Sequence, residues 1–340
     1  MNEIEFGLDT FGGVTHDEQG RPTPHPQVIR DLVGDAVVAD DLGLDFFAVG
    51  EHHRPDFAVS SPEMVLAAVA AATERIRLGS AVTVLSSDDP VRVYQRFATL
   101  DAVSRGRAEI VAGRGSFVES FPLFGYELGD YELLFEEKLA LLAELVSGDP
   151  VTWSGTVRAA LTEQRVFPTT ADRMPVWVGV GGTPESVVRT AKYGFGLFLA
   201  IIGGDPARFV PYIDLFERAQ DRFEVPRNRV AVHSPGLIAE TDEQARELAY
   251  DGWLAFRTKL GRERGWGPAG PREFENEIEH GSLYLGSPET VATKIARTLT
   301  TLKVDRFDLK YDQPVPHAVQ RRSIELYGEQ VVPMVKDMLA

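Results

Sequence analysis

The chain of 340 residues contains no cysteine, no long apolar run and no cluster of basic residues. The lack of cysteine excludes disulfides, thiolate zinc sites and cysteine nucleophiles. No apolar stretch approaches the roughly 20 residues of a membrane-spanning helix, and the N-terminus shows no signal-peptide pattern. Asp and Glu number 51 against 35 Lys and Arg, so the formal net charge is −16, which disfavours nucleic acids and anionic membranes as partners. These absences predict a cytoplasmic protein that acts on small molecules.

Short apolar segments alternate along the chain with segments of helical periodicity. Several of the apolar segments lack a polar alternation, which is typical of parallel strands covered on both faces. The expected strands are Ile4–Leu8, Asp45–Gly50, Ile76–Leu85, Arg107–Ala112, Val176–Val178, Phe195–Ile202, Arg229–Ala239 and Arg306–Lys310. The expected helices are Gln27–Leu42, Pro62–Thr73, Pro90–Val103, Glu127–Val146, one opening at Pro184, Pro206–Phe223, Asp242–Leu260, Pro288–Leu302 and His317–Leu339.

Eight such βα units predict an α/β fold of the (β/α)₈ TIM-barrel type, as one domain over residues 1–340. A doubly wound sheet is the alternative architecture. Two regions interrupt the repeat and are expected to be insertions, Val151–Pro168 and Gly261–Ser282. The second is rich in glycine, proline and charge without an apolar period, so we expect a mobile lid over the active site.

The segment Met174–Ala191 combines an apolar strand, three glycines and a helix start. Gly181 and Gly182 would let the backbone approach a ligand closely, while Thr183 suits the N-cap and Pro184 the first helical position. Free N–H groups at a helix N-terminus favour an anion such as phosphate. An ordinary tight turn with a good cap explains the same residues.

Active sites of such barrels lie at the C-terminal ends of the strands, so the residues at these ends are the candidates. Few of them carry a charge. Arg114 stands between two glycines; it could stay solvated, pair with Glu51 or Glu119, or hold a phosphate. His52 follows the second strand and is either a structural histidine or a proton-transfer group suited to neutral pH. The remaining histidines lack zinc-site spacing, so no metal is expected.

The order of several motifs resembles the bacterial luciferase-like family of flavin-dependent monooxygenases. The motifs are Glu51-His52-His53, Arg77–Pro90, Leu100–Gly115, Val178–Ser186, Ala200–Gly204 and Leu285–Glu289, and they span nearly the whole chain. The residue before Arg114 is Gly113, where the light-emitting α chains carry cysteine, so light emission is not expected.

The resemblance implies FMN in the mouth of a (β/α)₈ barrel. Arg114, Gly181, Gly182 and Thr183 would hold its phosphate. Ala81, Val82 and Thr83 would lie against the ring, with a cis peptide bond at Ala81–Val82. Glu51 and Ser116 would border the ring, Ala200, Ile201 and Ile202 would wall its other side, and His52 would be the catalytic histidine.

The function that the resemblance implies is oxygenation of a small, largely apolar, aldehyde-like substrate by reduced flavin and O₂. A separate NAD(P)H:flavin reductase would supply the reduced flavin, and a homodimer is expected from the family and the alanine-rich helix. Two alternatives stay open: a deazaflavin-dependent oxidoreductase that transfers hydride, and a flavin-binding protein without catalysis.

Overall fold

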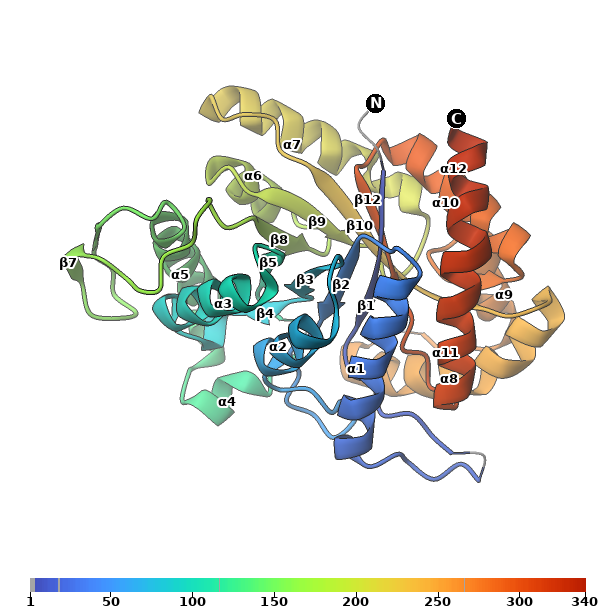
Figure 1. The fold of residues 1–340 in the computed structure, drawn as a ribbon. Coiled ribbons are helices and arrows are strands. Elements are labelled where there is room, and N and C mark those ends of the chain that lie inside the picture. The colour runs from blue at the N-terminus through green and yellow to red at the C-terminus, as the bar shows by residue number, and fades with distance from the viewer. Residues whose placement is uncertain (1–3, 18, 116, 266) are drawn as a thin grey trace.

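Eight parallel strands close a barrel at the centre of the molecule (Figure 1). The computed structural model describes residues 4–17, 19–115, 117–265 and 267–340. The barrel strands are β1 (Glu5–Thr10), β2 (Phe46–Val49), β3 (Arg77–Ser80), β5 (Ala108–Gly113), β8 (Val176–Val180), β9 (Gly196–Ala200), β10 (Val230–Ile238) and β12 (Arg306–Lys310). The barrel closes where β12 pairs with β1, with Leu309 opposite Leu8. The fold predicted from the βα alternation is therefore confirmed.

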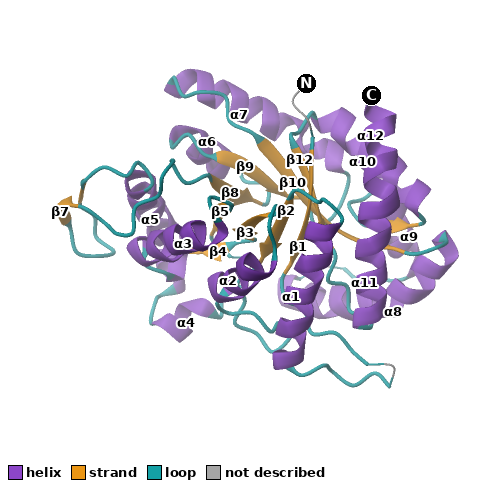
Figure 2. Ribbon diagram, in the orientation of Figure 1, coloured by secondary structure: helices purple, strands orange, loops and turns teal. Residues whose placement is uncertain are grey.

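Helices surround these strands on the outside (Figure 2). They are α1 (His25–Asp41), α2 (Pro62–Ala72), α3 (Pro90–Ser104), α4 (Ser120–Phe124), α5 (Tyr131–Leu145), α6 (Pro184–Lys192), α7 (Val210–Phe223), α8 (Asp242–Arg264), α9 (Pro271–Glu279), α10 (Pro288–Leu302), α11 (His317–Leu326) and α12 (Val332–Leu339). Short strands add β4 (Thr83–Val84) beside β5, and β11 (Tyr284–Gly286) beside β10. Within the described ranges, no helix is long and apolar enough to cross a membrane.

Alternation along each strand divides the buried side chains between two layers. On β1, Phe6 and Leu8 belong to the large apolar cluster formed with the surrounding helices. A second, smaller cluster contains inward-facing residues such as Phe46, Val111 and Phe198. The barrel interior is thus a packed core. The residues that follow several strands lie together at its C-terminal end, where a ligand can reach them.

The region Gly261–Ser282 is more regular than its composition predicts. The expectation of a segment without an apolar period was wrong, because α8 extends to Arg264 and α9 follows at Pro271. Phe274 and Ile278, four residues apart on α9, are buried against α8 and β11 residues such as Leu285. The helical period was present over only nine residues, too short to stand out between the flanking glycines and prolines. The other insertion forms an antiparallel hairpin, β6 (Val151–Trp153) and β7 (Leu161–Gln164), which projects from the barrel (Figure 1).

Three expected elements are divided or shortened. The strand expected over Ile76–Leu85 is interrupted between β3 and β4, where the Ala81–Val82 peptide bond is cis. The helix expected over Glu127–Val146 begins at Tyr131, after a 3₁₀ turn at Leu128–Asp130. The helix expected over His317–Leu339 becomes α11, a π-helical turn and α12, because Pro333 cannot donate a backbone hydrogen bond.

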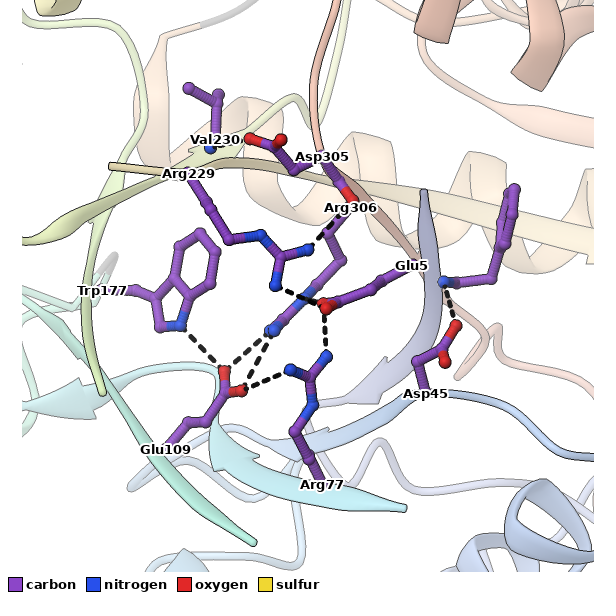
Figure 3. A network of polar contacts seen from close by, with 10 residues as sticks. Glu5, Asp45, Arg77, Glu109, Trp177, Arg229, Val230, Asp305 and Arg306 are labelled. Atoms are coloured by element: carbon purple, nitrogen blue, oxygen red, sulfur yellow. Dashed lines mark hydrogen bonds and ion pairs between the residues drawn. The ribbon is translucent and has the colours of Figure 1, made fainter. Parts of the chain in front are cut away.

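A charged network fills the N-terminal end of the barrel (Figure 3). Arg306, which is 0% exposed, donates to both carboxylate oxygens of Glu109 at 2.9 and 3.1 Å and to Glu5 at 2.8 Å. Trp177 donates its indole N–H to Glu109 at 2.8 Å. Burial alone would raise the pKa of Glu109, but the guanidinium groups of Arg306 and Arg77 outweigh it and lower that pKa. The network therefore keeps its carboxylates ionised inside the barrel.

Removing one partner of this network should destabilise the protein strongly. Glu109→Ala leaves the Arg306 guanidinium buried with fewer partners, which typically costs about 3–5 kcal/mol. The matched control is Glu240→Ala, which removes the exposed partner of Arg322 and should cost about 0–1 kcal/mol. Urea unfolding at neutral pH measures both; equal small losses would contradict a stabilising role for the network.

Candidate active site

The C-terminal ends of the parallel strands bring the predicted site residues to one end of the barrel. Glu51 and His52 follow β2, the segment from Ala81 joins β3 to β4, and Arg114 follows β5. The turn Gly181–Thr183 follows β8, and Ala200 is the last residue of β9. Because all these strands are parallel, their loops share the mouth of the barrel.

Val82 forms the floor of this mouth. A Cβ atom at Gly113 would lie 2.5 Å from Cγ2 of Val82, and one at Gly179 would lie 2.8 Å from its Cγ1. Glycine is therefore required at both positions, since any side chain would displace Val82. The cis bond that precedes Val82 agrees with the one that the resemblance implies.

Glu51 holds the segment that carries this floor. Its carboxylate accepts a hydrogen bond of 2.8 Å from the backbone N–H of Val84 and lies 2.9 Å from Nε2 of His53. The backbone N–H of Glu51 also donates to the carbonyl of Val82 at 3.3 Å. Glu51 thus orients the imidazole of His53 and not that of His52, because adjacent side chains on extended chain point in opposite directions and residues two apart share a side.

His52 is enclosed by aromatic rings. The ring centroids of Phe57, Phe11 and Phe117 lie 4.3, 4.6 and 5.5 Å from that of its imidazole. Burial, reinforced by the nearby charge of Lys310, lowers the pKa of His52 to about 3. Its Nδ1 is buried and has no partner among the described residues. Burial and the charges of Lys310, His53 and Arg54 all disfavour the imidazolium, so the structure favours a neutral imidazole over one that titrates near neutral pH.

Arg114 lies beside the helix that begins at the glycine turn. Its guanidinium pairs with Glu132 of α5 and stacks over the ring of Tyr131, 5.1 Å from the centroid. Glu132 also contacts Arg189 of α6 at 3.4 Å, which places Arg114 and α6 on two sides of one carboxylate. Neither carboxylate named from the sequence pairs with Arg114: Glu51 binds His53, and Glu119 binds Arg54 at 2.8 Å.

The turn before α6 has the conformation that its glycines permit. Gly182 adopts a φ of 118°, and its carbonyl accepts a 2.8 Å hydrogen bond from the Tyr212 hydroxyl. Thr183 occupies the N-cap position but makes no side-chain cap; its hydroxyl instead donates to that of Ser186 at 2.7 Å. Pro184 has no backbone N–H and that of Ser186 donates to the Thr183 carbonyl at 3.1 Å, so among the described first-turn residues the N–H of Glu185 is the one left for an anion.

The other predicted contact residues differ in how they can reach a ligand. Ala200 is half-buried and Ile202 is 50% exposed, whereas Ile201 packs into the cluster between barrel and helices. Ile201 can therefore line the mouth with its backbone but not with its side chain. Thr83 is fully buried, and its hydroxyl has no partner in the described part of the chain. Ser116, predicted to border the ring, lies outside the described residues.

Three residues at the mouth were not predicted from the sequence. Phe11 packs against His52 and stacks on His233, and His233 in turn lies 2.6 Å from a carboxylate oxygen of Asp9. The signal available was Asp9, a charged residue at an inward-facing position of β1. The sequence could not show that its partner stands 224 positions further along the chain.

Comparison with known proteins settles the family. The model of the family described as "Luciferase-like monooxygenase" matches residues 10–306. The chain belongs to this family. It is 28% identical to limonene 1,2-monooxygenase of Rhodococcus erythropolis over 309 residues, which cover 86% of this chain and 78% of that protein. It is 25% identical to an F420-dependent glucose-6-phosphate dehydrogenase of Nakamurella multipartita, covering 92% and 94% of the two chains. The protein is thus an oxidoreductase of this family, and its relatives include a monooxygenase and an F420-dependent dehydrogenase.

Solved structures show the same fold. The monooxygenase RslO1 of Streptomyces bottropensis superimposes with a TM-score of 0.82 at 22% identity, covering 97% of this chain and 99% of that one. The oxygenating constituent of 3,6-diketocamphane monooxygenase of Pseudomonas putida, solved in complex with FMN, gives 0.77 at 19% identity, with 98% of each chain covered.

His52 should remain neutral across the physiological range. Long-range ¹H–¹⁵N NMR of the imidazoles should show no protonation of His52 between about pH 5 and about pH 8, since burial disfavours the charged form. His317, which is paired with Asp35 and whose pKa is raised, provides the internal control and should titrate above the usual range. A midpoint for His52 near 6.5 would contradict the desolvated site.

Proposed function

We propose that the protein is an FMN-dependent monooxygenase that uses reduced flavin and O₂ to oxygenate a small, largely apolar organic substrate. The observation that carries this proposal is that Arg114 and the turn Gly181–Thr183 directly follow β5 and β8, which are neighbouring parallel strands. Two independent anion-binding elements lie together at the mouth of the barrel. A phosphate is the group that both would bind.

The residues present fit the rest of FMN as well. Glu51, Ala81, Val82 and Thr83 would border the ring from one side, with Ser116 beside them, and Ala200, Ile201 and Ile202 from the other. The buried Thr83 hydroxyl and the buried Nδ1 of His52 have no hydrogen-bond partner among the described residues. Buried polar groups are rarely left without one, so we expect a ligand to supply it. A ligand with polar edges and an aromatic body would supply such a partner.

When bound in its reduced form, FMN supplies the two electrons that activate O₂. The protein's own contribution is enclosure and orientation. Phe11, Phe57 and Phe117 form an aromatic wall around His52, which keeps water from the site and suits an apolar substrate, aldehyde-like in the simplest case. His52 is the proposed catalytic histidine, acting as a neutral imidazole that hydrogen-bonds the reacting groups.

Several partners complete the proposal. A separate NAD(P)H:flavin reductase would supply reduced FMN in the cytoplasm. A homodimer would cover the outer side of α2, where Met64 is 73% exposed beside small alanines such as Ala68 and Ala71. A deazaflavin-dependent hydride transfer is the second candidate, supported by the F420-dependent relative.

Arg114→Ala should weaken FMN binding by about 1.5–3 kcal/mol, the usual worth of hydrogen bonds to a charged group. Riboflavin, which has no phosphate, should lose much less. The matched control is Arg208→Ala, an exposed arginine in the loop after β9 at the same end of the barrel, which should leave both affinities unchanged. Fluorescence titration measures the three proteins; equal weakening of both flavins would reject the phosphate assignment.

Cofactor choice separates the two candidate functions. Wild-type protein should bind FMN more tightly than F420 and convert members of a panel of aldehydes, ketones and alkenes when given reduced FMN and O₂. His52→Ala should keep its FMN affinity and lose about 10²–10³-fold in product formation, the usual effect of removing one hydrogen bond to the reacting groups. Tight F420 binding with anaerobic hydride transfer would favour the dehydrogenase instead, and FMN binding without any turnover would favour a non-catalytic flavoprotein.

A further inference from the structure

A histidine–aspartate pair lies inside the barrel, separate from the residues assigned above. His233 of β10 and Asp9 of β1 come from strands that do not pair with each other, yet Nδ1 and Oδ2 lie only 2.6 Å apart. Both side chains are almost completely buried. The second oxygen of Asp9 has no partner in the described part of the chain.

The pair reaches the mouth of the barrel. His233 lies in register with Ala200, the last residue of β9, so it stands at the level where that strand leaves the sheet. Phe11 stacks on the His233 ring with centroids 5.7 Å apart and an interplanar angle of 14°. Phe11 also contacts the ring of His52, so the two imidazoles lie against one phenyl ring on the same wall.

We propose that His233, oriented by Asp9, is the residue that exchanges protons with the ligands of this site. A 2.6 Å contact needs a proton between Nδ1 and the carboxylate, which fixes the tautomer and leaves Nε2 as the atom that exchanges. Asp9 is then a positioning residue, because it acts through the imidazole. This inference rests on the proposed function and assigns a task that His52 cannot perform.

The surroundings of the two histidines explain the division of tasks. His52 has Lys310, His53 and Arg54 as its charged neighbours, and all three oppose an imidazolium. His233 has the carboxylate of Asp9 in contact, with Asp308 opposite it on β12 and Lys310 and Asp312 nearby. Burial raises the pKa of Asp9 and raises that of Asp308 well above its usual range. Asp308 is accordingly a neutral acid, and Asp9 is the group whose contact with Nδ1 fixes the orientation of the His233 imidazole.

The proton balance of the proposed reaction gives this residue its role. Substrate, O₂ and reduced FMN become oxygenated substrate, water and oxidised FMN; the two electrons and two protons come from the reduced flavin. One oxygen atom enters the substrate, and the other leaves as water after it has gained protons. His233 gives one proton from Nε2 to the departing oxygen and regains one from the flavin, so the pair is unchanged after each turnover.

The first test observes the pair directly in the full-length protein. In long-range ¹H–¹⁵N NMR, the neutral imidazole of His233 should carry its proton on Nδ1, because Asp9 accepts from that atom. Asp9→Asn should lose this preference and populate the tautomer with the proton on Nε2. A wild-type His233 without a proton on Nδ1, or an unchanged tautomer in Asp9→Asn, would overturn the proposal without bearing on whether the protein binds FMN.

The second test follows product formation with saturating reduced FMN and O₂ against pH. His233→Gln should lower the rate about 10²–10⁴-fold and remove the pH-dependent limb, with FMN affinity and melting temperature close to wild type. Asp9→Asn, which loses the tautomer that presents Nε2 correctly, should also lower the rate while FMN affinity stays close to wild type. The matched control is His317→Gln, which breaks the similar pair with Asp35 outside the site and should leave the limb in place. An unchanged limb in His233→Gln would overturn the proposal; absence of any product from wild type would instead overturn the proposed function, and the NMR result would still decide the role of the pair.

Discussion

Arg306 places a guanidinium inside the barrel, and the ion pairs that neutralise it determine which end of the barrel can hold a site. Its contacts with Glu109 and Glu5 tie β12, β5 and β1 together at their N-terminal ends. Trp177 of β8 joins the same network through Glu109 (Figure 3). A charge at this depth is tolerated only with its partners in place, so the network fixes these strands relative to one another. Ligands are left with the opposite end, where the loops begin.

At that opposite end, three kinds of surface meet above Val82. Glycines at positions 113 and 179 leave room for the Val82 side chain as the floor. Arg114 and the terminus of α6 supply positive potential on one side. The aromatic wall of Phe11, Phe57 and Phe117 supplies an apolar side. A ligand with an anionic tail and a flat, partly apolar body matches this division, and this match supports the flavin that we propose.

The two histidines on the aromatic wall show how strongly environment decides chemistry. His52 is surrounded by rings and cations, and its pKa falls to about 3. His233 shares the ring of Phe11 but contacts Asp9, which fixes the orientation of its imidazole. Two imidazoles on the same phenyl ring thus differ in their polar partners, and we propose that they differ in their tasks for this reason.

The barrel and much of its mouth could be predicted from the sequence, because they follow from local patterns. The apolar strands, the turn at Gly181 and Gly182, and the isolated Arg114 are all visible in short windows. The ionic partners were not predictable in this way. Glu132 lies 18 residues beyond Arg114, and Asp9 lies 224 residues before His233, so only the closed barrel brings each pair together. The protonation state of His52 was equally hidden, since it depends on rings from three separate loops. The apolar face of α9 was missed for a different reason, because its period covers so few residues.

The most direct test of the proposed oxygenation uses isotopic oxygen. Wild-type protein is mixed with reduced FMN, ¹⁸O₂ and a panel of apolar aldehydes, ketones and alkenes, and the products are analysed by mass spectrometry. We expect one ¹⁸O atom per molecule of product, formed only when protein, reduced FMN and O₂ are all present. Products that carry no ¹⁸O, or an equal yield under anaerobic conditions, would contradict the oxygenase function.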